Sequence, residues 1–431
     1  MSGRQPPRLI ILNAAQVITP IFQDSGSVSN STLRVIPDGA VLVEDGTILA
    51  VGTTEALRAD SRSQGADPLD ASHCVVAPGF VDSHTHLVFA ATRQEEYEMR
   101  LEGASYESIA AAGGGIRNSV RRLREVTEDD LFKMARQRCS QFLDYGTTTI
   151  EAKSGYGLDL ENELKILRVL TRLNGDPRVA LEIVPTFLGA HEIPDEFRDH
   201  PSKYVDLVCE AMIPRVVRER LADFCDVFCE SGVFTVEQSR RILTAAQRYG
   251  LKIKLHADQL SRSGGTRLAV ELGAVSADHL EQIDEEDITL LAKSKVVATL
   301  LPGASFHLGM TRFAPARKLL DGGACVALAS DFNPGTSPTV NMQTILAIAC
   351  SSLRMTPAET FAAATLGGAR ALASAERLGS LQAGKQADLV LFNVNDYRLV
   401  PYYYGMNMVR AVIKKGRVLF DRRNAWGEET L

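Results

Sequence analysis

The sequence has few cysteines and no long hydrophobic run. Only 7 of its 431 residues are cysteine, and no apolar stretch approaches the roughly 20 residues that a membrane-spanning helix requires. No signal peptide is recognisable either. These absences argue against a membrane protein and against a secreted domain stabilised by disulfides. We therefore expect a cytoplasmic protein with reduced thiols.

Positive charge is not in excess. The chain carries 47 Lys and Arg against 53 Asp and Glu, a formal net charge of −6 at pH 7. Because no basic stripe is present, the surface is poorly suited to nucleic acid or to an anionic membrane, and we expect neither as a partner. Cys225 and Cys229 lie close together, but no second pair follows at zinc-finger spacing. We interpret them as buried thiols of a strand.

Two histidines follow an apolar run near residue 80. Residues 75–86 read VVAPGFVDSHTH and end in His84 and His86. Because side chains two apart on a strand point to the same face, both imidazoles can bind one metal ion. The same spacing also suits a structural pair of histidines. The choice between a metal site and a structural pair therefore depends on histidines further along the chain.

Four further candidates follow other β-rich apolar runs. They are His191, His256, His279 and Asp331. Borderline divalent metals favour imidazole nitrogen together with a carboxylate oxygen, and a catalytic site keeps one position for water. Three histidines and an aspartate would supply such a site.

Strands and helices alternate through the middle of the chain, which predicts the α/β class. Apolar runs predict eight strands, at residues 75–81, 146–151, 180–187, 224–228, 251–255, 274–277, 296–301 and 325–330. Amphipathic segments predict helices between them, at residues 160–173, 204–217, 236–249, 266–272, 284–293 and 314–321. This alternation favours a closed (β/α)8 barrel over an open doubly wound sheet. The candidate ligands all fall at the carboxyl ends of strands, where barrels carry their active sites.

Both ends of the chain are β-rich without such alternation. Residues 9–12, 40–52, 387–394 and 409–420 predict strands. Asp45-Gly46 predicts a hairpin turn. Two β segments that flank a barrel can pair beside it. We therefore expect a barrel at residues 77–371 and a small β domain shared by residues 1–76 and 372–431.

The chain resembles the amidohydrolase superfamily over nearly its whole length. The resemblance rests on residues 78–86, on the strand ends at His256 and His279, on Ser330-Asp331, and on residues 379–390. It implies a distorted (β/α)8 TIM barrel with a β-sandwich built from both termini. It also implies one divalent metal, zinc or iron, with four ligands: His84, His86, His256 and Asp331.

Within this superfamily the chain is similar to the imidazolonepropionase family. Six segments carry this likeness, at residues 112–116, 153–159, 187–191, 226–230, 276–280 and 330–335. The resemblance implies hydrolysis of a small-molecule substrate, 4-imidazolone-5-propanoate, to N-formimidoyl-L-glutamate in histidine degradation. It also implies a homodimer. Arg93, Tyr156, His191 and Thr336 would contact the substrate, and Tyr156, Asn333 and Gly335 the product.

Opening a cyclic amide requires an activated water molecule. A bound divalent metal can lower the pKa of water from about 15.7 to about 7. Asp331 would then accept the water proton and return it to the leaving nitrogen, while His279 would hold the water or the developing oxyanion. Arg93 offers the forked donors that a carboxylate prefers, although a surface salt bridge would explain it equally well.

Other interpretations stay open. A deaminase of this superfamily would usually carry glutamate where this chain has Gln259, whose amide can recognise a ring edge but cannot act as a base. Another cyclic amide hydrolase would keep the same ligands. A non-catalytic scaffold would be expected to lose them, yet all four candidates are present. Lys153 follows the second predicted strand and not the fourth, so we favour one metal over a lysine-bridged pair.

Overall fold

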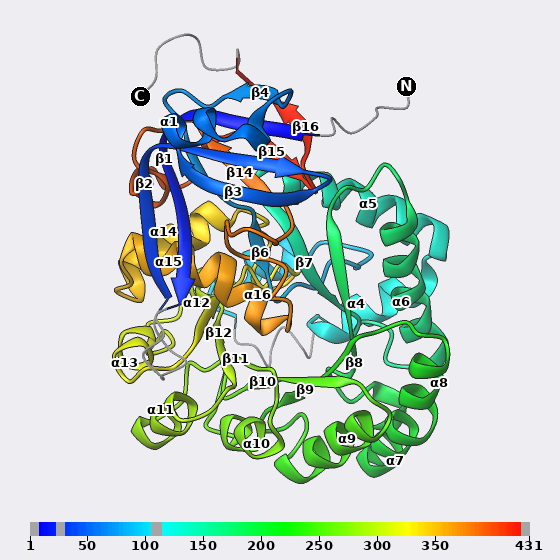
Figure 1. Ribbon diagram of the computed structural model, residues 1–431. Coiled ribbons are helices and arrows are strands. Elements are labelled where there is room, and N and C mark those ends of the chain that lie inside the picture. Colours follow the sequence, from blue (N-terminus) through cyan, green and yellow to red (C-terminus); the bar gives the residue numbers. More distant parts are fainter. Residues whose placement is uncertain (1–7, 23–30, 105–113, 424–431) are drawn as a thin grey trace.

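The computed structural model describes residues 8–22, 31–104 and 114–423. They form two sheets, one parallel and ringed by helices, the other mostly antiparallel and drawn from both ends of the chain (Figure 1). The remaining residues include the outer ends of the predicted small domain and the Ala112-Gly113 part of one family segment, which thus lie outside the described residues.

The parallel sheet has eight strands that neighbour one another in chain order. They are β6 (Phe80–Asp82), β7 (Thr147–Lys153), β8 (Glu182–Ala190), β9 (Phe224–Cys229), β10 (Lys252–Ala257), β11 (Ser276–His279), β12 (Val297–Leu300) and β13 (Val326–Leu328). Their residues are buried almost throughout, as expected for parallel strands covered by helices. The eight predicted barrel strands are confirmed, apart from the start of the first.

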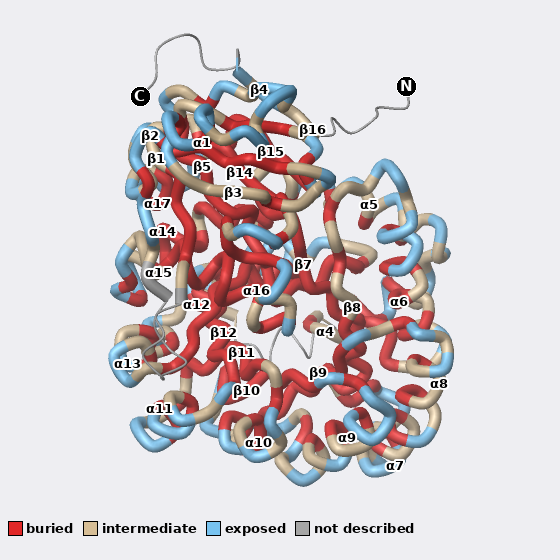
Figure 2. Tube along the Cα trace, viewed as in Figure 1, coloured by how far each residue is buried: buried red, intermediate tan, exposed pale blue. Residues whose placement is uncertain are grey.

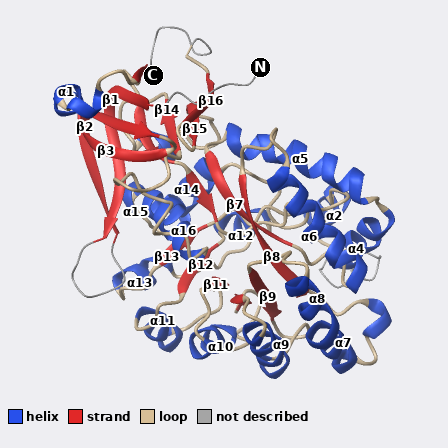
Figure 3. Cartoon of the chain, turned by 45° about the vertical axis from the view of Figure 1, so that its right-hand side comes forward, coloured by secondary structure: helices blue, strands red, loops and turns tan. Residues whose placement is uncertain are grey.

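Helices follow these strands and lie outside the barrel (Figure 3). The first are α2 (Gln94–Leu101), α4 (Ile116–Glu125), α5 (Glu128–Asp144), α6 (Leu160–Gly175) and α9 (Val236–Arg248). Later ones are α10 (Gly265–Leu272), α11 (Glu285–Ala292), α12 (Pro302–His307), α13 (Ala316–Asp321), α14 (Met342–Ser352), α15 (Pro357–Ala362) and α16 (Gly368–Ala371). Five of the six predicted helices are confirmed with shifts of a few residues at their ends.

The predicted helix at residues 204–217 is divided into three parts. It consists of α7 (Pro201–Leu207), a π-helical turn (Val208–Met212) and α8 (Ile213–Arg218). Pro214 has no backbone N–H to donate to the carbonyl of residue 210, so the helix widens there instead of continuing regularly.

The second sheet joins both ends of the chain. It runs in the order β16 (Arg417–Asp421), β15 (Val409–Lys414), β14 (Leu389–Phe392), β5 (Val75–Pro78), β1 (Arg8–Phe22), β2 (Ser31–Glu44) and β3 (Thr47–Thr53). Short elements complete it: β4 (Asp67–Asp70) pairs with β1, and α1 (Thr54–Ala59) packs against β2 and β3. The short helix α17 (Leu399–Tyr402) packs against α14. Ile11, Val41, Leu389 and Ile413 share one apolar core, so the two ends are packed into one layer (Figure 2).

The apolar run at residues 75–81 does not form the single strand that its pattern predicts. It breaks at Gly79, so that β5 pairs with β1 and β14 in the terminal sheet while β6 opens the barrel. A Cβ atom added to Gly79 would lie 2.3 Å from Thr148 Oγ1, so this crossing against β7 requires glycine. One short run therefore serves both sheets.

Candidate active site

The barrel closes through the segments that carry the predicted metal ligands. Beyond β6 and β13, the His86 N–H donates to the Phe332 carbonyl at 2.8 Å, and the Asp331 N–H donates to the His84 carbonyl at 3.0 Å. Below them, Asp82 accepts hydrogen bonds from the backbone and hydroxyl of Ser330 at 2.9 and 2.5 Å. Closure thus brings the first and last strands, and the side chains after them, to one place.

The candidate ligands form two overlapping clusters at the carboxyl ends of the strands. In His84, His86 and His256, one ligand atom of each lies within 4.8 Å of the others, and the same holds for His84, His279 and Asp331. The Oδ1 atom of Asp331 lies 3.5 Å from His84 Nε2 and 3.6 Å from His86 Nε2. The structure therefore brings together the ligand set and both residues predicted to be catalytic.

This donor set fits a divalent cation. Burial lowers the pKa of His84, of His86 and of His279 well below the usual value, which leaves neutral imidazoles with lone pairs. Burial also raises the pKa of Asp331 to about 7. His84 Nε2 is a buried atom without a hydrogen-bond partner in the described part of the chain. Neutral imidazoles beside a carboxylate are typical zinc or iron ligands.

Five buried charged residues lie under the ligands and are called here the charged layer: Glu151, Lys153, Asp226, Lys254 and Asp278. The Lys153 ammonium lies 2.7 Å from Glu151 Oε1 and 2.7 Å from Asp226 Oδ2. The Lys254 ammonium donates to the Ser83 carbonyl at 2.7 Å. Although burial acts to lower it, the neighbouring carboxylates, led by that of Asp226, raise the pKa of Lys153, which stays charged.

The charged layer holds one imidazole by a hydrogen bond and places a carboxylate beside a second. Asp278 Oδ2 lies 2.7 Å from His84 Nδ1, and Asp226 Oδ2 lies 3.0 Å from His256 Nδ1. A carboxylate on one ring nitrogen fixes the tautomer and turns the other nitrogen toward a metal. The prediction from the sequence did not include the charged layer. Strand periodicity carried a signal for it, because Lys254 and His256 are two apart and so share a face.

Above the ligands lies a cavity of about 470 Å³. His86, His256, His279 and Asp331 line it. Tyr156, His191, Gln259, Asn333 and Thr336 also line it, together with Arg93, Glu96 and Arg100. Most of the residues predicted to meet substrate thus face one space.

The loop that carries Tyr156 is anchored from below. Glu163 accepts hydrogen bonds from the backbone N–H groups of Gly155, Gly157 and Leu158 at 2.7 to 3.1 Å. Gly155 has φ of +102°, and a Cβ atom there would lie 2.9 Å from His191 Nδ1.

Burial lowers the pKa of His191 to about 3, so the ring is neutral. Its Nδ1 lies 2.9 Å from the Gly155 carbonyl and must donate to it, which leaves Nε2 as an acceptor.

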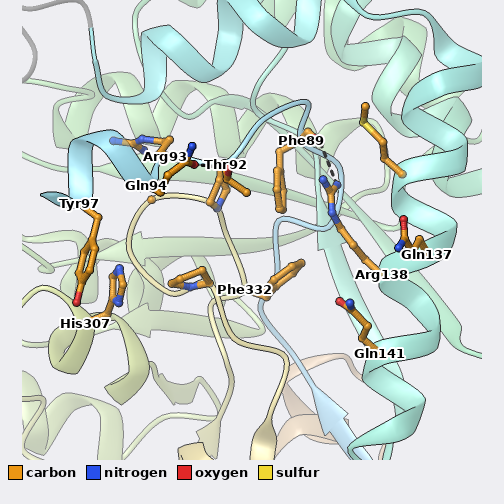
Figure 4. A pocket seen from close by; sticks show the side chains of 14 residues that line it. Phe89, Thr92, Arg93, Gln94, Tyr97, Gln137, Arg138, Gln141, His307 and Phe332 are labelled. Atoms are coloured by element: carbon orange, nitrogen blue, oxygen red, sulfur yellow. Dashed lines mark hydrogen bonds between the residues drawn. The ribbon is translucent and has the colours of Figure 1, made fainter.

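The loop after β13 is held by Asn333. Its Oδ1 accepts from the Gly335 and Thr336 N–H groups at 2.8 and 2.7 Å, and its Nδ2 donates to the Asp331 carbonyl at 2.7 Å. Gly335 lies against Arg93, because an added Cβ atom would be 2.2 Å from Arg93 Nη1. Both residues also line a neighbouring cavity of about 640 Å³ (Figure 4). Gly335 is the one predicted substrate or product residue that does not line the 470 Å³ cavity.

Two buried glutamates support the remaining site residues. Glu230 accepts from the Leu260 N–H at 2.8 Å and holds the loop after Gln259. Glu281 accepts from Ser305 Oγ at 2.9 Å, and its Oε2 lies 3.9 Å from His279 Nδ1. His279 and Asp331 have φ of +84° and +53°, a backbone region that non-glycine residues adopt uncommonly and in which Asp and His are enriched.

Comparison with known families agrees with this geometry. The model of the amidohydrolase family matches residues 75–419, and that of the imidazolonepropionase-like composite domain of bacteria matches residues 39–61. The imidazolonepropionase of Geobacillus kaustophilus is 49% identical over 418 residues, which cover 96% of this chain and 98% of that protein. The chain belongs to the imidazolonepropionase family of amidohydrolases. The imidazolonepropionase of Brevibacillus brevis is 48% identical and covers 95% of this chain and 97% of its own length.

Solved structures share the fold at lower identity. A triazine hydrolase from Arthobacter aurescens is 18% identical with a TM-score of 0.74, covering 96% of this chain and 95% of its own. A 5-methylcytosine deaminase from Klebsiella pneumoniae is 19% identical with a TM-score of 0.73, covering 96% and 98%. They support the distorted barrel with a separate terminal sheet. Among the described residues, no helix is long and apolar enough to cross a membrane.

Proposed function

We propose that the chain hydrolyses the cyclic amide of 4-imidazolone-5-propanoate to N-formimidoyl-L-glutamate. The near full-length relatives named imidazolonepropionase support this reaction. One observation about the geometry carries it: imidazoles, a carboxylate and two arginines line a single cavity. A substrate with a polar ring and a propionate needs both kinds of group.

The proposed metal ligands are His84, His86, His256 and Asp331. A divalent cation bound there would lower the pKa of water and polarise the ring carbonyl. Imidazole and carboxylate suit zinc and iron alike, so the donor set supports either metal.

Proton transfer is assigned to Asp331. Water adds to the ring carbonyl carbon, the carbon–nitrogen bond breaks, and the proton that Asp331 accepts passes to the leaving nitrogen, so that atoms balance. General acid-base catalysis of this kind contributes about 10² to 10⁴ in rate. His279, which lines the same cavity as Asp331, would hold the water or the oxyanion.

The walls would recognise the substrate. His191 offers Nε2 as an acceptor for a ring N–H, and Gln259 can match a ring edge that both donates and accepts. Burial raises the pKa of Tyr156, which keeps its hydroxyl as a donor. Arg93 would contribute to binding the propionate.

The test combines metal content with ring opening on one purified sample. We expect about one zinc or iron per chain, and loss of imidazolone ultraviolet absorbance that stops after chelation and resumes when metal is restored. A sample with metal but no ring opening would contradict the proposed substrate. Hydrolysis of another cyclic amide and deamination would then be the reactions to test. Sedimentation of the same sample would test the predicted homodimer.

A further inference from the structure

We propose that Arg100 is a substrate-binding residue and supplies the unpaired positive charge that holds the substrate's propionate beside Arg93. This inference rests on the proposed function and adds a residue to its site. Arg93 and Arg100 are seven positions apart at α2, two helical turns, so both can reach one face of this segment. Both line the 470 Å³ cavity.

Arg93 already has a carboxylate partner within the protein. Its Nε donates to Glu96 Oε2 at 2.7 Å, and its Nη2 lies 2.6 Å from the same oxygen. That oxygen also accepts from the Gly115 N–H at 3.1 Å, while Glu96 Oε1 accepts from Asn118 at 3.3 Å. The charge of Glu96 is therefore committed to Arg93 and to the start of α4.

Arg100 has no such partner among the described residues. Its Nη1 donates to the Gly335 carbonyl at 3.3 Å, and its guanidinium lies 5.5 Å from the Tyr97 ring centroid. Its Nη2 is buried without a hydrogen-bond partner in the same part of the chain. Burial and then the nearby Arg93 lower the pKa of Arg100, although the Glu96 carboxylate acts to raise it.

A carboxylate would resolve this imbalance. In the described part of the chain, the ion pair of Arg93 with Glu96 leaves the Arg100 guanidinium without an ion-pair partner and its Nη2 donor unused. A buried donor left without an acceptor costs free energy, and a guanidinium pairs best with a planar carboxylate. Among the substrate's groups, only the propionate meets both requirements, and the ring would then extend toward His279 and Asp331.

Gly335 links the two arginines to the catalytic loop. Its Cα packs against Arg93, its carbonyl accepts from Arg100, and its N–H donates to Asn333, which also binds the Asp331 carbonyl. Filling the propionate position would therefore fix the loop that carries Asp331.

The test compares Arg100→Gln, Arg100→Lys and Arg122→Gln on 4-imidazolone-5-propanoate and on its neutral carboxamide analogue. Arg122 is an exposed arginine of α4 and serves as the matched control. We expect Arg100→Gln to lower kcat/KM for the propionate about 30- to 300-fold, mainly through KM, and to change that for the carboxamide less than about threefold. Arg100→Lys should restore part of the loss, and Arg122→Gln should match the wild type. Calorimetry should show the same weakening for N-formimidoyl-L-glutamate.

Equal losses on both substrates would assign Arg100 a structural role and overturn the inference. Unchanged kinetics of Arg100→Gln on the propionate, with an active wild type, would overturn it as well and leave the proposed function intact. A metal-loaded wild type that opens neither ring would instead refute the proposed function, and this inference with it.

Discussion

The charged layer and the arginine pair of the cavity handle charge in opposite ways. In the charged layer, Glu151, Asp226 and Asp278 face two ammonium groups, so one negative charge is left over beneath the imidazoles. At the cavity, Arg93 pairs with Glu96, and Arg100 has no ion-pair partner among the described residues, so one positive charge is left over. Charges that are paired inside the protein position other side chains, whereas the charge left unpaired in each group indicates the sign of the ligand charge.

The largest expected effect comes from Asp331→Asn, which alters the proposed metal site and leaves the two arginines of the cavity unchanged. The amide keeps the shape of the carboxylate but cannot accept a proton and is a poorer metal ligand. We expect kcat to fall by about 10³ or more, with loss of bound metal. Elemental analysis and ring-opening kinetics would measure both. Full metal content with near-normal turnover would show that the base lies elsewhere.

Lys153→Met tests whether the charged layer is a positioning device. It removes one ammonium group and leaves Asp226 and Glu151 buried with less compensation, which typically costs about 3–5 kcal/mol. Urea unfolding of the metal-free protein should show that loss. Metal affinity should drop about 10- to 100-fold, because the carboxylates would orient His84 and His256 less firmly.

A second variant separates orientation from simple instability. Lys133→Met removes a lysine that pairs with Asp130 on the surface of α5 and should change neither quantity appreciably. If Lys153→Met lowers stability but binds metal as tightly as the wild type, then the layer only stabilises the fold.

Gly335→Ala disturbs the proposed propionate site without removing a charge. The added methyl group would overlap Arg93 Nη1, so the guanidinium must shift from its present position. We expect KM for the propionate substrate to rise about tenfold while kcat and metal content change little. Steady-state kinetics with the carboxamide analogue provides the control, since its KM should stay nearly constant.

Tyr156→Phe should have the smallest effect of the series. The ring keeps its packing against His86 and His191, and only the hydroxyl donor is lost. One neutral hydrogen bond typically contributes about 0.5–1.5 kcal/mol, so we expect kcat/KM to fall about 2- to 12-fold. A loss beyond about 100-fold would indicate that the hydroxyl takes part in the chemistry.

The proposed metal ligands were far easier to predict from the sequence than Arg100. His84, His86, His256 and Asp331 stand at strand ends, and the barrel's symmetry brings strand ends together whatever the helices do. Arg100 lies in a polar helix, where an arginine usually faces solvent. Its contact with the Gly335 carbonyl joins residues more than two hundred positions apart, and no local pattern carries that information.

The same limit explains the misjudged elements. The run at residues 75–81 is uniformly apolar, and its division at Gly79 is set by pairing with β1, β14 and β7. The charged layer was missed because lysine and aspartate in a strand usually mark an exposed face. Inside a barrel, that face is the interior, and only the assembled set of charges makes burial tolerable.

The position of β5 between β1 and β14 also constrains biosynthesis. Strands β1 to β5 leave the ribosome early, but β14 pairs with β5 and is made only after all barrel strands. Until residues 389–392 emerge, the edge of β5 has no antiparallel partner, and exposed strand edges invite intermolecular pairing. During synthesis, the nascent terminal sheet therefore exposes a strand edge of the kind that chaperones protect.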